Sequence, residues 1–140
     1  MEPVLFDTSL YVSALRAGPA SAAQLSAAAA SSEIWLSSVV LGELYAGAKA
    51  TDRRIVERLE EIFDRAQRIL VPNLTDWTQT GKILALLRAK YDYVRTGRGQ
   101  LTNDALIATS AGRKGVTILT ANPAGFIKLA EFCPFHWRNQ

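Results

Sequence analysis

Four short apolar runs, rich in β-branched or aromatic residues, are separated by longer segments in which apolar residues recur at helical spacing. These candidate strands lie at residues 4–6, 34–36, 69–71 and 116–119, with a weaker candidate at 133–135. Strands that alternate with helices are typical of a parallel α/β sheet. The pattern therefore predicts a single three-layer α/β domain, with a central parallel sheet of four to five strands flanked by helices.

The segments between the strands predict helices of different character. Residues 20–30 contain seven alanines, and alanine is the strongest helix former. Ser37 or Ser38 can cap a second helix, and Thr51 or Asp52 can cap a third, which carries a stripe of charged residues on one face. The helices after the first are predicted at about 38–50, 52–67, 76–93 and 102–113, and a last short helix is predicted after residue 123. The glycines of segment 97–99 are expected to separate the helix at 76–93 from the helix at 102–113.

Composition and charge narrow the class of protein. A chain of 140 residues fits one domain, taken here as residues 1–140. Cys133 is the single cysteine, which excludes an internal disulfide framework, and no apolar stretch approaches the ~18 residues of a membrane span. We therefore expect a cytoplasmic protein without a leader or a membrane partner. The net charge of +3 is mild, but it favours a polyanionic partner such as nucleic acid if several acids are gathered in one site.

Three acidic residues stand where the surroundings are apolar. Asp7 ends the first apolar run, Glu43 lies among apolar and small residues of a predicted helix, and Asp104 precedes the apolar segment 105–108. A buried carboxylate is costly unless a cation or hydrogen-bond donors compensate it. Ligands of a parallel sheet bind beyond the carboxyl ends of its strands, where Asp7 and Asn122 are both expected.

Each acid taken alone also has a structural interpretation. Asp7 could cap a helix that begins directly after it. Glu43 could reach an arginine across a helix interface, and Asp104 could complement the dipole in the first turn of a helix. Three carboxylates in one place, however, repel one another unless a cation intervenes, and oxygen ligands alone suit Mg²⁺ or Mn²⁺. A shared divalent-metal site is therefore our preferred hypothesis.

Other chemistries lack their parts in this sequence. His136 is the only histidine, so zinc fingers and Ser-His-Asp or Cys-His arrangements are disfavoured. Neither GxGxxG after the first strand nor GxxxxGK[ST] is present, which disfavours an enzyme with a nucleotide cofactor. A phosphotransferase with Asp7 as nucleophile would be expected to carry a second aspartate at position 9, which is Ser9. Of the reactions considered, metal-assisted hydrolysis of phosphodiesters is the one that these residues still allow.

Three short segments resemble the motifs of the PIN-domain nucleases, and within that family the VapC-type toxins of bacterial toxin–antitoxin modules. They are Leu-Phe-Asp-Thr-Ser at 5–9, Ser-Val-Val-Leu-Gly-Glu-Leu at 38–44 and Leu-Thr-Asn-Asp-Ala-Leu-Ile-Ala at 101–108. The resemblance implies a PIN-like (Rossmann-like) fold in which Asp7, Glu43 and Asp104 bind metal and are catalytic. A fourth segment carries Asn122, a further catalytic candidate, where many relatives have aspartate. A second metal should then bind more weakly, since an amide adds no negative charge.

The region from residue 82 to residue 98, before the third motif, is basic. It holds five cations and a single acid, Asp92, with Tyr91 and Tyr93 interleaved; the cations are Lys82, Arg88, Lys90, Arg95 and Arg98. Such a surface could follow phosphates and stack on unpaired bases, or it could be an ordinary solvated helix face. The candidate substrate-binding residues are Thr8, Thr120, Arg88, Arg95 and Arg98.

The resemblance implies a Mg²⁺- or Mn²⁺-dependent endoribonuclease toxin, with tRNA or rRNA as the expected substrate. It further implies inhibition by a small antitoxin protein and the formation of a homodimer. Two alternatives stay open at this point. One is a PIN-type nuclease of RNA maturation or DNA processing, and the other is a nucleic-acid-binding PIN module whose catalysis is weak because of Asn122.

Overall fold

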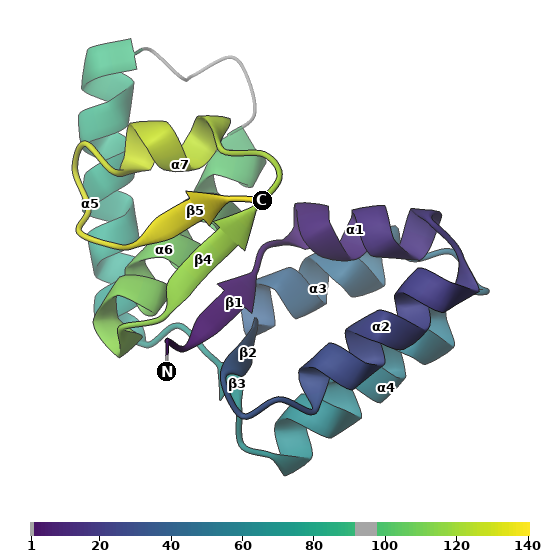
Figure 1. Ribbon diagram of the computed structural model, residues 1–140. Helices are drawn as coiled ribbons and strands as arrows, with labels where there is room; N and C mark the ends of the chain where they lie inside the picture. The colour runs from purple at the N-terminus through teal and green to yellow at the C-terminus, as the bar shows by residue number, and fades with distance from the viewer. Residues whose placement is uncertain (1, 92–97) are drawn as a thin grey trace.

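Five parallel strands form one sheet in the order β3-β2-β1-β4-β5 in the computed structural model, which describes residues 2–91 and 98–140 except for the side chains of 98–100 (Figure 1). The strands are β1 (Val4–Phe6), β2 (Ile34–Ser37), β3 (Ile69–Leu70), β4 (Thr117–Thr120) and β5 (Trp137–Asn139). The helices are α1 (Thr8–Arg16), α2 (Pro19–Ala29), α3 (Ser38–Gly47), α4 (Arg53–Arg65), α5 (Leu74–Tyr91), α6 (Arg98–Lys114) and α7 (Ala124–Leu129). The α/β class and the parallel sheet flanked by helices are confirmed.

The middle of the sheet is formed by β1 and β4, whose side chains build the core. Leu5 of β1 is paired in register with Trp35 of β2 on one side and with Ile118 of β4 on the other. Leu5 and Ile118 are fully buried, and every residue of β4 is buried. A parallel strand covered on both faces is expected to read as a continuous apolar run, which is why these two strands stand out in the sequence.

Local sequence explains where several helices begin. Gly18 has a φ of 109°, a conformation that glycine adopts readily, and Pro19 then starts α2 with its φ already suited to a helix. The Ser37 side chain caps α3 by accepting a hydrogen bond from the backbone N–H of Val39. Along α4, Leu59 and Phe63 are fully buried, while the charged face is turned to solvent.

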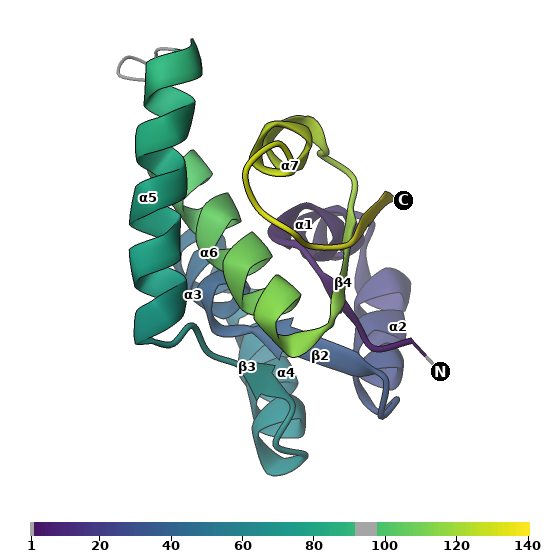
Figure 2. The ribbon, with the colours of Figure 1, turned by 90° about the vertical axis from the view of Figure 1, so that its left-hand side faces the viewer.

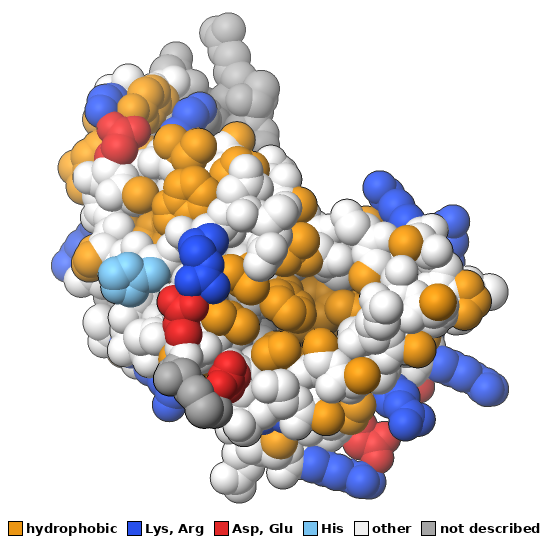
Figure 3. Space-filling view, viewed as in Figure 1, with side chains coloured by type: hydrophobic (Ala, Val, Ile, Leu, Met, Phe, Trp, Pro, Cys, Tyr) orange, Lys and Arg blue, Asp and Glu red, His pale blue; other side chains and the backbone are white. Residues whose placement is uncertain are grey.

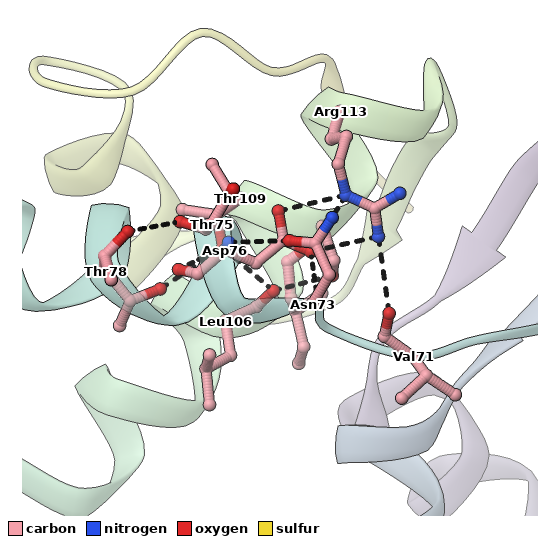
Figure 4. Close-up of polar contacts among 11 residues, drawn as sticks. Val71, Asn73, Thr75, Asp76, Thr78, Leu106, Thr109 and Arg113 are labelled. Atoms are coloured by element: carbon pink, nitrogen blue, oxygen red, sulfur yellow. Dashed lines mark hydrogen bonds and ion pairs between the residues drawn. The ribbon is translucent and has the colours of Figure 1, made fainter.

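Helices α5 and α6 lie side by side in both ribbon views and are joined at one end by a polar network (Figures 1, 2 and 4). Asn73 and Asp76 form reciprocal hydrogen bonds at the start of α5, with each side chain accepting from the backbone N–H of the other. Arg113 of α6 donates to both carboxylate oxygens of Asp76 and to the carbonyl oxygen of Val71. These contacts account for the burial of the Asp76 carboxylate.

Two predicted boundaries are wrong. The last strand lies at Trp137–Asn139 rather than at 133–135. The prediction missed it because β5 is an edge strand with two exposed residues and has no apolar run in its sequence. Cys133 is instead buried in the core beyond the end of α7. Helix α6 begins at Arg98 rather than at residue 102, so Gly99 belongs to its first turn, where backbone N–H groups have no helical partner anyway. Gly97 and the predicted helix end at Tyr93 lie outside the described residues.

Of the helices in the described part of the chain, none is long and apolar enough to cross a membrane.

Candidate active site

A cleft of about 380 Å³ opens beyond the carboxyl ends of β1 and β4. The strand order reverses direction between these two strands, so the cleft lies at the switch point where parallel sheets bind their ligands. Side chains from α1, α3, α6 and the loop after β4 line this acidic cleft, namely Asp7, Thr8, Ser9, Val12, Ser13, Arg16, Glu43, Asp104, Ile107, Ala121 and Asn122. The structure therefore brings the three acids and Asn122 to one place.

Asp7 follows β1 directly and is 6% exposed. One of its oxygens, Oδ1, accepts hydrogen bonds from the backbone N–H of Ser9 (2.8 Å) and from the Ser9 hydroxyl. The other, Oδ2, accepts a hydrogen bond of 2.6 Å from the Thr120 hydroxyl. Asp7 is thus the N-cap of α1 and also a lining residue of the acidic cleft, so the capping interpretation and the site interpretation both describe it.

The two hydroxyls that hold Asp7 are themselves fixed by backbone groups. The Ser9 hydroxyl accepts from the N–H of Ala121 (3.0 Å), and the Thr120 hydroxyl accepts from the N–H of Asn122 (2.9 Å). Each hydroxyl therefore links the Asp7 carboxylate to the loop that carries Asn122. Thr120 is fully buried, is not among the residues that line the cleft, and makes a positioning contact with Asp7, so its role in substrate binding stays a prediction from the sequence.

Glu43 reaches the cleft from α3, the helix that follows β2. Its side chain is partly buried, and its Oε1 accepts a hydrogen bond of 2.7 Å from the Thr8 hydroxyl. Within the described residues Glu43 makes no ion pair, so an arginine partner does not account for it. The Thr8 hydroxyl ties Glu43 to the start of α1, next to Asp7.

Asp104 reaches the cleft from α6. Because α6 starts at Arg98, Asp104 lies beyond its first turn, so complementing the helix dipole does not explain this acid. Its carboxylate lies against the first turn of α7: a Cβ atom added at Gly125 would be 2.5 Å from the Oδ2 of Asp104. Gly125 therefore provides the space that this carboxylate occupies.

The donor atoms of the acidic cleft fit a hard divalent cation. Carboxylate oxygens of Asp7, Glu43 and Asp104 and the amide oxygen of Asn122 are the ligands that Mg²⁺ and Mn²⁺ prefer, and none of the described lining residues offers sulfur or imidazole. As the side chains stand, however, no three acidic, histidine or cysteine residues of the described chain converge on one metal position. Side-chain rotation is needed to gather them, above all at Glu43, whose carboxylate is engaged by Thr8.

Three polar residues of the cleft were not predicted from the sequence. Ser9, Ser13 and Arg16 are separated from one another by four and three residues on α1, which places them on one face of the helix. Helical spacing counted from Ser9, the last residue of the first motif, was the signal that could have found Ser13 and Arg16. Arg16 is the only cation among the residues that line the acidic cleft in the described structure.

The described residues of the predicted basic surface do not line this cleft. Arg88 is exposed on α5, and Lys90 forms an ion pair with Glu131, a residue distant in sequence. A hydrogen bond from Lys90 lowers the pKa of the Glu131 carboxyl, and the same contact raises the pKa of the Lys90 amine. Arg95 and the side chain of Arg98 lie outside the described structure.

Comparison with known proteins identifies the fold family. The profile of the PIN domain matches residues 4–131. Similar solved structures include DNA-bound VapBC from Salmonella typhimurium (23% identity, TM-score 0.66, covering 99% of this chain and 98% of that chain). A second is VapBC2 from Rickettsia felis bound to a DNA fragment from its promoter (23% identity, TM-score 0.63, covering 98% of this chain and 98% of that chain). A third is FitAcB from Neisseria gonorrhoeae (20% identity, TM-score 0.65, covering 97% of this chain and 96% of that chain). The comparison with curated proteins gives no match. The family match covers most of the chain, which therefore belongs to the PIN domain family.

Proposed function

We propose that this protein is a Mg²⁺- or Mn²⁺-dependent endoribonuclease that acts as the toxin of a toxin–antitoxin module. PIN domains are nucleases and generally use divalent metals. The observation that carries the proposal is the acidic cleft itself, in which Asp7, Glu43 and Asp104 come from three separate elements to the switch point of the sheet. We infer that the domain includes residues 1–140, because β5 continues the sheet beyond the matched range 4–131.

The residues of the cleft have distinct roles in this proposal. A divalent cation, when bound, would polarise a phosphoryl oxygen and lower the pKa of a water molecule. Asp7 is held on both oxygens by hydroxyl groups, so its carboxylate is fixed before any ligand arrives. Glu43 and Asp104 complete the acidic set, while Asn122 offers an exposed, neutral oxygen at the rim. The Thr8 hydroxyl, next to Glu43, is the proposed contact for substrate.

The proposed partners follow from the likeness to VapBC and FitAcB. We infer that a small antitoxin protein inhibits the nuclease and that the chain forms a homodimer. RNA is the proposed substrate, with tRNA or rRNA as the expected targets, and the activity would then take place in the cytoplasm.

Incubation of purified protein with total RNA, followed by mapping of new RNA ends, tests this proposal. Cleavage is expected with Mg²⁺ or Mn²⁺ and should stop on addition of EDTA. The variant Asp7→Asn should lose cleavage but keep its fold, because asparagine caps helices about as well as aspartate does. Asp64→Asn, on the exposed face of α4, is the matched control and should cleave normally.

Other outcomes would point elsewhere. Undiminished RNA cleavage by Asp7→Asn would refute the assignment of the site. Cleavage of DNA with RNA left intact would favour the DNA-processing alternative. The weakly catalytic binding module is favoured by the neutral Asn122 and by the absence of three convergent acids among the described residues, and it predicts RNA binding without cleavage. In that case Asn122→Asp, which restores a fourth carboxylate, should raise activity.

A further inference from the structure

A second hollow continues the acidic cleft along α1. It has a volume of about 430 Å³ and shares Val12, Arg16 and Glu43 with the cleft. From there it extends to the turn between α3 and α4, where Lys49 and Asp52 line it. The two hollows together form one groove, the α1 groove, with Arg16 at their junction.

The charges along this groove suggest how a polyanion could enter it. Among the described residues, three carboxylates line the cleft and repel a phosphodiester backbone, so phosphates beside the reacting one need cations near the acids. Arg16 is exposed and makes no ion pair within the described structure, so its guanidinium is available. The planar guanidinium group also matches the geometry of a phosphate.

The length of α1 indicates which phosphate Arg16 can reach. Asp7 caps the start of this helix of nine residues and Arg16 ends it, so their backbones are separated by about 13.5 Å along the helix axis. Both side chains nevertheless line the same cleft. Arg16 is therefore placed to bind a phosphate next to the reacting one, rather than the reacting phosphate itself.

Lys49 extends the same path. It is exposed on the turn after α3, and it lines the part of the α1 groove farther from the acids of the cleft. Lys and Arg side chains gather along the margin of the molecule formed by α1, α2 and α4 (Figure 3). On α5, by contrast, Lys90 is already paired with Glu131. Lys82 and Arg88 are exposed on α5 but line neither hollow, so the described cations that lie next to the acids are those of the α1 groove.

We propose that Arg16 and Lys49 bind the backbone phosphates of an RNA strand on one side of the cleavage point, and that the α1 groove is the path of that strand. The inference rests on the proposed nuclease function, since it assigns the substrate path of the same site. Arg16 and Lys49 contact substrate in this scheme and take no part in the reaction itself.

The salt dependence of RNA binding tests the proposal. Binding of a fluorescent single-stranded RNA oligonucleotide is measured by anisotropy at several salt concentrations, in the presence of EDTA and in the Asp7→Asn background so that no cleavage occurs. Each phosphate contact contributes about 0.7 to the slope of log K against log salt concentration. Arg16→Gln and Lys49→Gln should each lower that slope by about 0.7 and weaken binding, and Arg16→Lys should retain the slope because it retains the charge.

Two matched variants remove the same charge elsewhere. Arg65→Gln lies at the end of α4, outside both hollows, and its slope should be that of the background protein. Arg88→Gln tests the α5 surface. Unchanged slopes in both groove variants, or a lowered slope in Arg88→Gln alone, would overturn the proposed path while leaving the nuclease proposal intact. Failure of the protein without these changes to bind or cleave any RNA would overturn both.

Discussion

The Asp7 carboxylate combines two tasks that looked like alternatives in the sequence. It lines the acidic cleft, and its Oδ1 caps α1 by accepting a hydrogen bond from the backbone N–H of Ser9, while its Oδ2 accepts one from the Thr120 hydroxyl. Because Ser9 and Thr120 hold those oxygens through groups that also bind the loop after β4, a change at either hydroxyl would disturb the carboxylate and the loop together. The position of Asp7 thus depends on residues more than a hundred positions away in sequence.

Gly125 offers a way to displace one acid of the cleft without removing it. In Gly125→Ala, the new Cβ would lie 2.5 Å from the Oδ2 of Asp104, which is too close, so the carboxylate must move. The end of a side chain moves easily, so we expect little loss of stability. Nuclease activity should nevertheless fall, by up to about a hundredfold, because a displacement of about 1 Å can cost that much. Cleavage assays and thermal unfolding of the same preparation measure both effects.

Gly112 provides the contrasting control. A Cβ at this position would lie 2.4 Å from the backbone carbonyl oxygen of Pro134, which cannot move without shifting the chain. Gly112→Ala should therefore lower the melting temperature and leave the activity of the folded fraction close to normal. If Gly125→Ala cleaves RNA normally, the position of the Asp104 carboxylate is not critical.

At the scale of elements, a tyrosine–carboxylate contact joins α3 and α4. The Tyr45 hydroxyl donates a hydrogen bond of 2.5 Å to Oε1 of Glu60, and this bond, with a smaller contribution from burial, raises the pKa of Tyr45 to about 12. Because the folded state holds this proton more tightly than the unfolded state, the contribution to stability is complete below about pH 10 and is lost as the pH rises to about 12.

Thermal unfolding between pH 8 and 12 checks this expectation. The unfolding free energy of the unmodified protein should fall more steeply above pH 10 than that of Tyr45→Phe, which has no phenolic proton to lose. Other tyrosines and lysines titrate in the same range, so only the difference between the two proteins reports on Tyr45. Parallel pH profiles would show that the contact adds nothing measurable.

Elements were predictable from the sequence in proportion to their burial. The central strands β1 and β4 appear as apolar runs, because each lies between two neighbouring strands and every residue of β4 is buried, and Pro19 and Ser37 mark helix starts by local chemistry alone. The strand β5 was misplaced because an edge strand with exposed Arg138 and Asn139 carries no such run. Cys133 made segment 133–135 look like a strand, but this residue is buried because the segment after α7 packs against the core, a contact that the sequence does not show.

Contacts between distant residues limited the prediction at the scale of the whole molecule. The acids of the cleft were identified by their apolar neighbours, but the bond from Thr8 to Glu43 and the space left by Gly125 for Asp104 depend on tertiary packing. The positive charge of the basic surface before the third motif was overestimated from the sequence, because Glu131, which is distant in the chain, forms an ion pair with Lys90. Local charge balance cannot register such a partner.

Metal binding should be visible in the stability of the whole molecule, independently of activity. A cation that binds only the folded state, present at a hundred times its dissociation constant, adds about 2.7 kcal/mol to the unfolding free energy. For a domain of this size that corresponds to a rise of roughly 5–10 °C in melting temperature. We therefore expect Mn²⁺ at millimolar concentration to raise the melting temperature and EDTA to reverse the change.

The variants Glu43→Gln and Glu57→Gln decide whether such a rise comes from the acidic cleft. Glutamine at position 43 can still accept the hydrogen bond from Thr8 but offers the cation no charge, so the rise should shrink. Glu57 is exposed on α4 and does not line the cleft, so Glu57→Gln should respond to Mn²⁺ as the unmodified protein does. An equal rise in both variants would place the metal elsewhere. No rise at all in the unmodified protein would count against metal dependence, because the carboxylates would then be held by hydrogen bonds alone.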